Sequence, residues 1–199
     1  MTRAPVVTAL RAVRRGRAEV ELDGASWRVV PLEAVLRAGL VLGGQLERGQ
    51  VREVRREIRR QEALAVALRS LRHRAHTAAS LEARLERRGI ASGDRHRTLA
   101  ALGRAGLVDD ARFAHGRAAA LAERGSGDLM IADDLERHGL SPELVREAIA
   151  ALQAESERAE GIVEERGLSP KTLQALGQRG FTEASLEPFI AQVGAQAIG

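Results

Sequence analysis

The sequence predicts a mainly α-helical protein, built as tandem three-helix repeats in an elongated array, with a small β-hairpin or sheet element at the N-terminal end. Three observations predict it. Short alternating segments separated by turn residues precede Pro31, and after it apolar residues recur at helical spacing. A six-residue string that contains a glycine then occurs three times along the chain.

The N-terminal segments read as strands at 6–10, 17–22 and 27–30. Arg15-Gly16 and Asp23-Gly24 stand between them, and such pairs are typical of tight hairpin turns. Because isolated hairpins are marginally stable in water, we expect this sheet to pack on a helix, with Trp27 as its anchor.

From Pro31 onward every segment reads as helical. We expect helices at 32–38, 47–75, 78–88, 95–104, 110–124, 128–138, 142–165, 170–179 and 183–193. The residues that suit N-terminal caps are Thr77, Asp109, Ser141, Ser169 and Thr182. The glycines that suit left-handed C-terminal caps are Gly89, Gly106, Gly125, Gly139 and Gly180.

The recurring string is Leu-x-x-basic-Gly-apolar. It runs from Leu85 to Ile90, from Leu135 to Leu140 and from Leu176 to Phe181. Each copy closes one helix, and a capped helix follows it, which predicts a three-helix unit used three times. The expected boundaries are 1–45 for the N-terminal element with a short helix, 46–106 for the long helix and first repeat, 107–152 for the second repeat and 153–199 for a shortened third.

Composition excludes several classes of function. The 199 residues contain no Cys, which rules out disulfides, thiolate metal sites and cysteine nucleophiles. Aromatic residues are 2% of the chain, so a roomy aromatic-lined ligand pocket is not expected. No apolar run approaches the roughly 20 residues of a membrane span, and the stretch from Ala4 to Leu10 is too short for a secretion signal. We therefore expect a cytoplasmic protein with no membrane contact.

Charge is distributed unevenly along the chain. Residues 1–106 carry a balance of +11, whereas residues 107–199 carry −7, within a net charge of +4. A basic half favours a polyanion or an acidic protein as partner, although arginines that only solvate helix faces would give the same count.

Candidate chemistry is sparse. His73 and His76 lie three residues apart, but no third ligand is evident, and solvated histidines are the favoured interpretation. Asp133 and Asp134 read as a solvated acidic face. Asp109 fits a helix cap, with Asp110 in the first turn where the helix dipole favours an anion, and Phe113 is expected to pack with Leu107 as a hydrophobic staple. We predict no catalytic residue, no metal and no cofactor, and hence no enzyme.

Several of these strings resemble the RecX-type recombination regulators. They are Leu68 to Arg72 with Thr77, Leu81, Leu85 and Gly89-Ile90, then Gly106 to Ala114, and then Gln178 to Thr182. The second is similar to the family's most recognisable motif, an apolar pair followed by Asp-Asp and then Phe-Ala. The residues that carry the likeness are mainly caps and core positions. Together with Gly139 of the recurring string, the structural motif residues are Asp109, Asp110, Phe113, Gly89, Gly180 and Phe181.

The resemblance implies a partner, the RecA recombinase filament on single-stranded DNA. It also implies that the protein restrains the ATPase, strand-exchange and co-protease activities of the recombinase. We expect a monomer, because an elongated array need not self-associate. The candidate contact residues lie in the most basic repeat, and they are Arg69, Arg72, Arg74, Arg84, Arg87 and Arg88. Solvation alone would explain these arginines equally well.

Two alternatives remain from the sequence. A helical DNA-binding protein, such as a transcription regulator, would bind duplex DNA with a steep salt dependence, but the chain has no Asn and no clear base-reading helix. An adaptor scaffold for another protein is the third reading.

Overall fold

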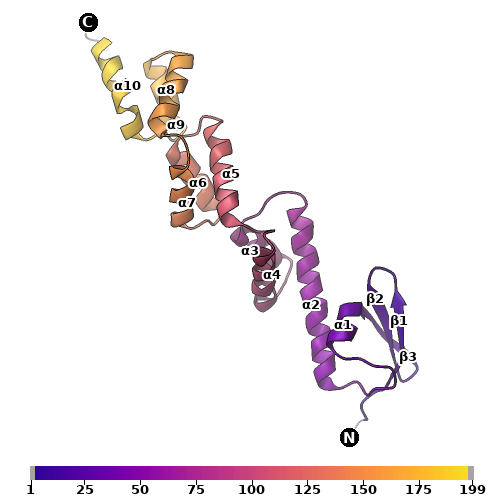
Figure 1. Ribbon diagram of the computed structural model, residues 1–199. Coiled ribbons are helices and arrows are strands. Elements are labelled where there is room, and N and C mark those ends of the chain that lie inside the picture. Colours follow the sequence, from indigo (N-terminus) through magenta and orange to yellow (C-terminus); the bar gives the residue numbers. More distant parts are fainter. Residues whose placement is uncertain (1–2, 197–199) are drawn as a thin grey trace. The chain divides into compact units, whose positions relative to one another are not determined.

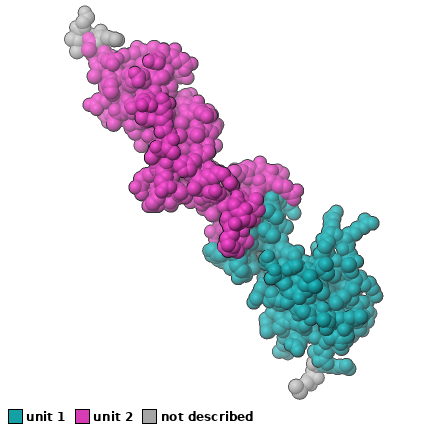
Figure 2. Space-filling model, in the orientation of Figure 1, with its two compact units in different colours: residues 1–70, 85–98 teal, residues 71–84, 99–199 magenta. Residues whose placement is uncertain are grey.

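The computed structural model describes residues 3–196 and forms two compact units (Figures 1 and 2). Unit 1 comprises residues 1–70 and 85–98, and unit 2 comprises residues 71–84 and 99–199. The described chain is mostly helical with one small antiparallel sheet, which confirms the predicted fold class.

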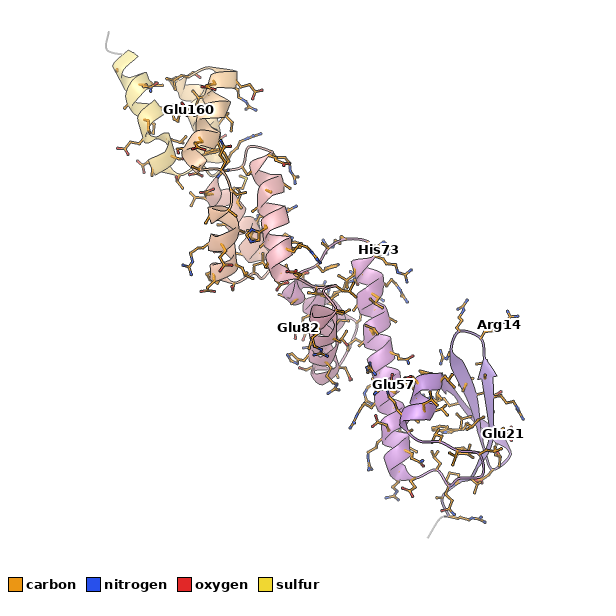
Figure 3. The ribbon with its side chains drawn as sticks, in the orientation of Figure 1. Arg14, Glu21, Glu57, His73, Glu82 and Glu160 are labelled. Atoms are coloured by element: carbon orange, nitrogen blue, oxygen red, sulfur yellow. The ribbon has the colours of Figure 1, made fainter. Side chains whose placement is uncertain are left out.

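The sheet of unit 1 is a three-stranded meander. Strands β1 (Val7–Val13), β2 (Arg17–Leu22) and β3 (Ala25–Pro31) pair antiparallel in the order β1-β2-β3. At the two predicted turns, Arg15-Gly16 and Asp23-Gly24, all four residues have positive φ, as the favoured two-residue hairpin turns require. Arg14 lies at the tip of the first hairpin (Figure 3).

Two helices complete the core of unit 1. Helix α1 (Leu32–Arg37) follows the sheet directly, and α2 (Arg48–Leu71) is the long basic helix. The buried core is made of small aliphatic side chains from the sheet, α1, the following loop and α2, with Trp27 packed partly buried against it. The buried carboxylate of Glu57 on α2 faces α1, where Arg37 Nε lies 3.6 Å away (Figure 3). The sheet therefore packs on helices, as expected.

Helices α3 (Ala78–Arg87) and α4 (Ser92–Arg104) carry residues of both units. The apolar positions Leu81 and Leu85 of α3 are fully buried. Ile90, directly after the first glycine of the recurring string, is buried as well. The first copy of the string thus ends a helix and places an apolar side chain inside the protein.

The remaining helices of unit 2 form two three-helix groups (Figure 1). Helices α5 (Asp110–Ala122), α6 (Asp128–Arg137) and α7 (Pro142–Ala150) share one core, centred on Ile131 and Leu135. Helices α8 (Glu155–Arg166), α9 (Pro170–Gln178) and α10 (Glu183–Gln196) share another, centred on Leu176 and Phe181. The second and third copies of the string lie in the middle helix of each group.

One predicted helix is wrong. The expected helix at 142–165 is two helices, because the backbone leaves the helical path after Ala150 and Ala154 is extended. No Gly or Pro marks this break. It places Glu155 at the start of α8, where its side chain makes tertiary hydrogen bonds that local periodicity does not encode. In addition, α4 begins at Ser92 rather than residue 95, and α2 ends at Leu71 rather than residue 75.

Candidate functional site: helix-end junctions and a basic surface

The Asp-Asp motif caps two helices rather than one. Asp109 accepts a hydrogen bond from the Arg112 N–H at 2.9 Å and so caps α5, as predicted. The sequence predicts only that Asp110 interacts favourably with the dipole of α5. In the structure its Oδ1 also accepts a hydrogen bond at 2.8 Å from the N–H of Ala78, the first residue of α3. The motif therefore ties the start of α5 to the start of α3.

Phe113 lies half-buried against the core of the α5–α7 group, and its ring centroid is 5.3 Å from that of His138. The predicted staple with Leu107 is wrong, because Leu107 is 50% exposed. The residue directly before the cap, Val108, is the buried one. The chain turns there so that the earlier leucine faces outward.

The end of α6 meets the start of α3, and we call this contact the first junction. The Thr77 hydroxyl donates to the His138 carbonyl at 2.6 Å while accepting from the Ser80 N–H, so one side chain serves both helix ends. Gly139 has a φ of +76°, and a Cβ there would lie 2.5 Å from the Ala79 methyl. Gly139 thus acts as a helix cap and as a close contact, of which the sequence predicted only the cap.

The end of α9 meets the start of α6 in the same relation, and we call this contact the second junction. Here the backbones bond directly: Gly127 N–H donates to the Arg179 carbonyl at 2.8 Å, and Leu129 N–H donates to the Gly180 carbonyl at 3.0 Å. A Cβ on Gly127 would lie 2.2 Å from the Phe181 nitrogen, and one on Gly180 would lie 2.5 Å from the Met130 nitrogen. These glycines let two helix ends approach to hydrogen-bonding distance.

Gly89, the first glycine of the series, differs from Gly139 and Gly180. Its φ is +73°, yet a Cβ there would meet nothing within 4 Å. It is therefore needed for its backbone conformation alone.

Glu155 is the polar centre of the second junction, and sequence reasoning missed it. Its carboxylate accepts from the Asp128 N–H at 2.6 Å, from the Thr182 N–H at 3.0 Å and from the Thr182 hydroxyl. Burial alone would raise the pKa of Glu155, but these hydrogen bonds together lower it below the usual value. Glu155 is the first residue of α8 as Asp110 is of α5, so an alignment of the two groups offered a signal for it.

Arg158 on α8 completes this junction. The Arg158 side chain is 9% exposed. Its guanidinium pairs with Asp128, donates to the Ser126 carbonyl at 2.7 Å and lies 5.8 Å from the centre of the Phe181 ring. Burial raises the pKa of Asp128, and the Glu155 carboxylate raises it further. Two acids and one cation are therefore held together in a partly buried cluster, and sequence spacing gave no sign of it.

The predicted acidic face and the histidine pair are also corrected. Asp134 is not a solvated residue: Arg117 donates to its two carboxylate oxygens at 2.8 and 2.9 Å, which lowers the pKa of Asp134 below its usual value. Asp133 is exposed, as expected. His76 is buried beyond the end of α2, with Nδ1 3.1 Å from the Ser80 hydroxyl, whereas His73 is exposed (Figure 3). Among residues 3–196, no group of three His, Cys, Asp or Glu could hold a metal ion.

The six candidate contact arginines divide between the two units. Arg69, Arg87 and Arg88 belong to unit 1, and all three are exposed. Arg72, Arg74 and Arg84 belong to unit 2, where Arg84 is partly buried and the other two are exposed. Within the described chain no helix is long and apolar enough to cross a membrane.

These features define the class of protein: a helical-repeat protein of three-helix groups, joined through glycine-capped ends of their middle helices, with basic side chains on the surface. The comparisons agree with that class. Residues 109–149 match the family model described as RecX, second three-helix domain.

Comparisons with named relatives and with a solved structure show the family to which the chain belongs. A "Regulatory protein RecX" from Halorhodospira halophila is 35% identical over 126 residues, covering 58% of this chain and 78% of that one. A "Regulatory protein RecX" from Deinococcus radiodurans is 32% identical over 151 residues, covering 76% and 71%. A crystal structure of regulatory protein RecX has the same fold, with a TM-score of 0.78 at 18% identity over 94% of this chain and 99% of that one. The chain belongs to the RecX family.

Proposed function

We propose that this protein is a non-catalytic regulator that binds the RecA recombinase filament on single-stranded DNA and restrains its ATPase, strand-exchange and co-protease activities. The observation that carries the proposal is membership of a family whose named relatives are regulatory proteins. The second three-helix domain that defines the family model is the group whose cap residues Asp109 and Asp110 link α5 to α3.

The repeat construction supports binding to a filament. A filament presents the same subunit surface many times, and a protein of similar helical groups can contact successive subunits. Once one group is bound, the later contacts are intramolecular and add avidity. We propose the groups as contact modules with the boundaries 46–106, 107–152 and 153–199, after an N-terminal element at 1–45.

The basic surface supports an acidic or nucleic-acid-bearing partner. Arg87 ends α3 and Arg88 follows it, and both side chains are exposed beside the open space around Gly89. We propose that Arg69, Arg72, Arg74, Arg84, Arg87 and Arg88 contribute to the contact with the filament. Arg87 and Arg88 are the best test, because changing them disturbs neither junction.

The test measures ATP hydrolysis by the cognate recombinase on single-stranded DNA, with and without substoichiometric amounts of the full-length protein. We expect suppression by the wild type and weakened suppression by the double variant Arg87→Glu/Arg88→Glu. The matched control, Arg104→Glu/Arg146→Glu, makes the same change in net charge at other exposed positions and should suppress as the wild type does. Far-UV circular dichroism checks that helix content is unchanged.

Two results would contradict the proposal. If the wild-type protein leaves the ATPase rate unchanged and instead binds duplex DNA with an affinity that falls steeply with salt, it acts on DNA directly. If suppression by the Arg87/Arg88 variant equals that of the wild type, the contact surface lies elsewhere.

A further inference from the structure

Two adjoining pockets lie in unit 2 between the segment before α3 and helices α5 and α6. One has a volume of about 300 Å³ and the other about 460 Å³, and both are lined by Ala75, His76, Phe113 and Arg117. We call them together the Arg74–Leu107 groove, after the residues at its two ends. Ser80 and His138 of the first junction line part of this groove, whereas Arg74 and Leu107 take no part in either junction.

One end of the groove is positively charged. Arg117 is fixed by its paired hydrogen bonds to Asp134, and Arg137 lies 2.9 Å from the exposed carboxylate of Asp133. Arg74 is exposed and has no hydrogen bond or ion pair within the described part of the chain, so its charge is uncompensated.

The histidine that lines both pockets is buried. Burial lowers the pKa of His76, and the cationic side chains of Arg74 and Arg84 lower it further. The groove therefore keeps its histidine neutral while presenting the guanidinium of Arg74 to solvent.

The other end of the groove is mostly apolar. Leu107, Phe113, Gly116 and Ala120 line it, beside Asp109 and Arg112. Leu107 is half-exposed because the chain turns at Val108, and a leucine held at the edge of a pocket offers a contact for another apolar side chain. Arg74 thus lines one pocket and Leu107 the other, and the four lining residues that the pockets share connect the two.

We propose that the Arg74–Leu107 groove binds an acidic peptide segment of a protein partner. A carboxylate of the segment pairs with Arg74, and a neighbouring apolar side chain of the segment packs on Leu107 and Phe113. Charge complementarity favours an acidic occupant, and the apolar end favours a peptide over a polynucleotide.

Single-stranded nucleic acid fits the groove less well. Its binding relies on aromatic side chains on which successive bases stack. Phe113 is the one Phe, Tyr or Trp among the residues that line these two pockets, and the ring of His138 already packs against it, while His76 is buried.

The test measures fluorescence anisotropy of a labelled peptide of repeating Asp-Glu-Leu with the full-length protein, beside a Lys-Lys-Leu peptide and oligothymidine. We expect the acidic peptide alone to bind. Arg74→Glu should weaken its binding by about tenfold or more, since a charge-assisted hydrogen bond becomes a repulsion. Leu107→Ser should weaken it by about threefold to tenfold.

The control, Arg146→Glu, makes the same charge change on the exposed face of α7 and should bind the acidic peptide as the wild type does. Equal weakening by this control would show a non-specific charge effect and overturn the proposal. The proposal is also overturned if the acidic peptide does not bind, if Arg74→Glu leaves its affinity unchanged, or if oligothymidine binds more tightly in an Arg74-dependent way. No recombinase is present, so this outcome is independent of the ATPase test.

Discussion

Both junctions join the end of one helix to the start of another, but different chemical groups make the contact in each. In both, a glycine-capped helix end meets the start of the middle helix of the preceding group. The first junction is made by side chains, with Thr77 bonded to the His138 carbonyl and Asp110 to the Ala78 N–H. The second is made by backbone groups of Gly127 and Gly180, with the Glu155 carboxylate beside them.

The difference between the junctions shows two separate roles of the glycine in the recurring string. Its positive φ ends the helix in all three copies of the string, but its missing Cβ matters only where another helix start lies against it. At the first junction the Ala79 methyl occupies that space, and at the second the facing Gly127 lets the backbones touch. The same sequence pattern therefore allows two distances between helix ends: one with a methyl group between them and one with the backbones in direct contact.

The largest effect is expected from Gly127→Ala. The new methyl would lie 2.2 Å from backbone atoms of Gly180 and Phe181, so the second junction must open. We expect a loss of about 3 kcal/mol in unfolding free energy, measured by urea denaturation followed by circular dichroism. Amide exchange in α8–α10 should rise with it.

Gly161→Ala is the matched control. Gly161 lies inside α8 with open space around it, so the methyl should be neutral or stabilise the protein by about 0.5–1 kcal/mol. Equal effects of the two substitutions would show that the close approach at Gly127 is not what holds this junction together.

Glu155→Gln should have the next largest effect. We expect it to lower the unfolding free energy by about 2 kcal/mol in the same urea denaturation, because three donors would face a neutral amide instead of a carboxylate. Glu160→Gln, on the exposed surface of α8, is the control and should change little (Figure 3). If Glu155→Gln lowers the unfolding free energy no more than Glu160→Gln does, the Glu155 carboxylate does not stabilise the second junction.

Acid titration sharpens the same comparison. The folded-state pKa values of Glu155 and Asp134 are lowered, so the stability they contribute is present above their unfolded-state pKa, near 4, and is lost as the pH falls through the folded values. The raised pKa of Asp128 acts with the opposite sign, because its buried charge costs stability at neutral pH. In urea titrations, Glu155→Gln should therefore lose less stability than the wild type between neutral pH and pH values below 4. An unchanged pH dependence in this variant would contradict the assignment.

Thr77→Val tests the first junction and should lower the unfolding free energy by about 1–2 kcal/mol. It removes the cap of α3 and the hydrogen bond to the His138 carbonyl while keeping the volume of the side chain. Thr77→Ser keeps the hydroxyl and should restore most of the stability in the same denaturation measurement. Failure of serine to restore it would mean that Thr77 acts by packing instead.

Gly89→Ala should have the smallest effect, about 1 kcal/mol, from the cost of a left-handed backbone alone. Gly180→Ala adds the clash with Met130 and should cost clearly more in the same denaturation experiment. Equal costs would show that the two glycines serve only as caps.

Local signals predicted much of this fold. Positive-φ glycines, cap residues such as Ser141 and Ser169, and the hairpin turns are encoded within a few residues of where they act, and the structure confirms them. The tertiary partners were not predictable in this way. Arg117 and Asp134 lie 17 residues apart, and Thr77 and His138 lie 61 apart, so spacing along one helix gives no sign of either pair. The break before Glu155 has the same origin, since its hydrogen bonds reach α6 and α10.

Co-sedimentation is the direct test of the proposed binding to the recombinase filament. Recombinase assembled on single-stranded DNA is pelleted with the full-length protein, beside the same DNA without recombinase. We expect the protein to enter the pellet with the filament and to stay in the supernatant with DNA alone. Recovery in the supernatant in the presence of filaments, at concentrations that saturate the DNA with recombinase, would contradict it.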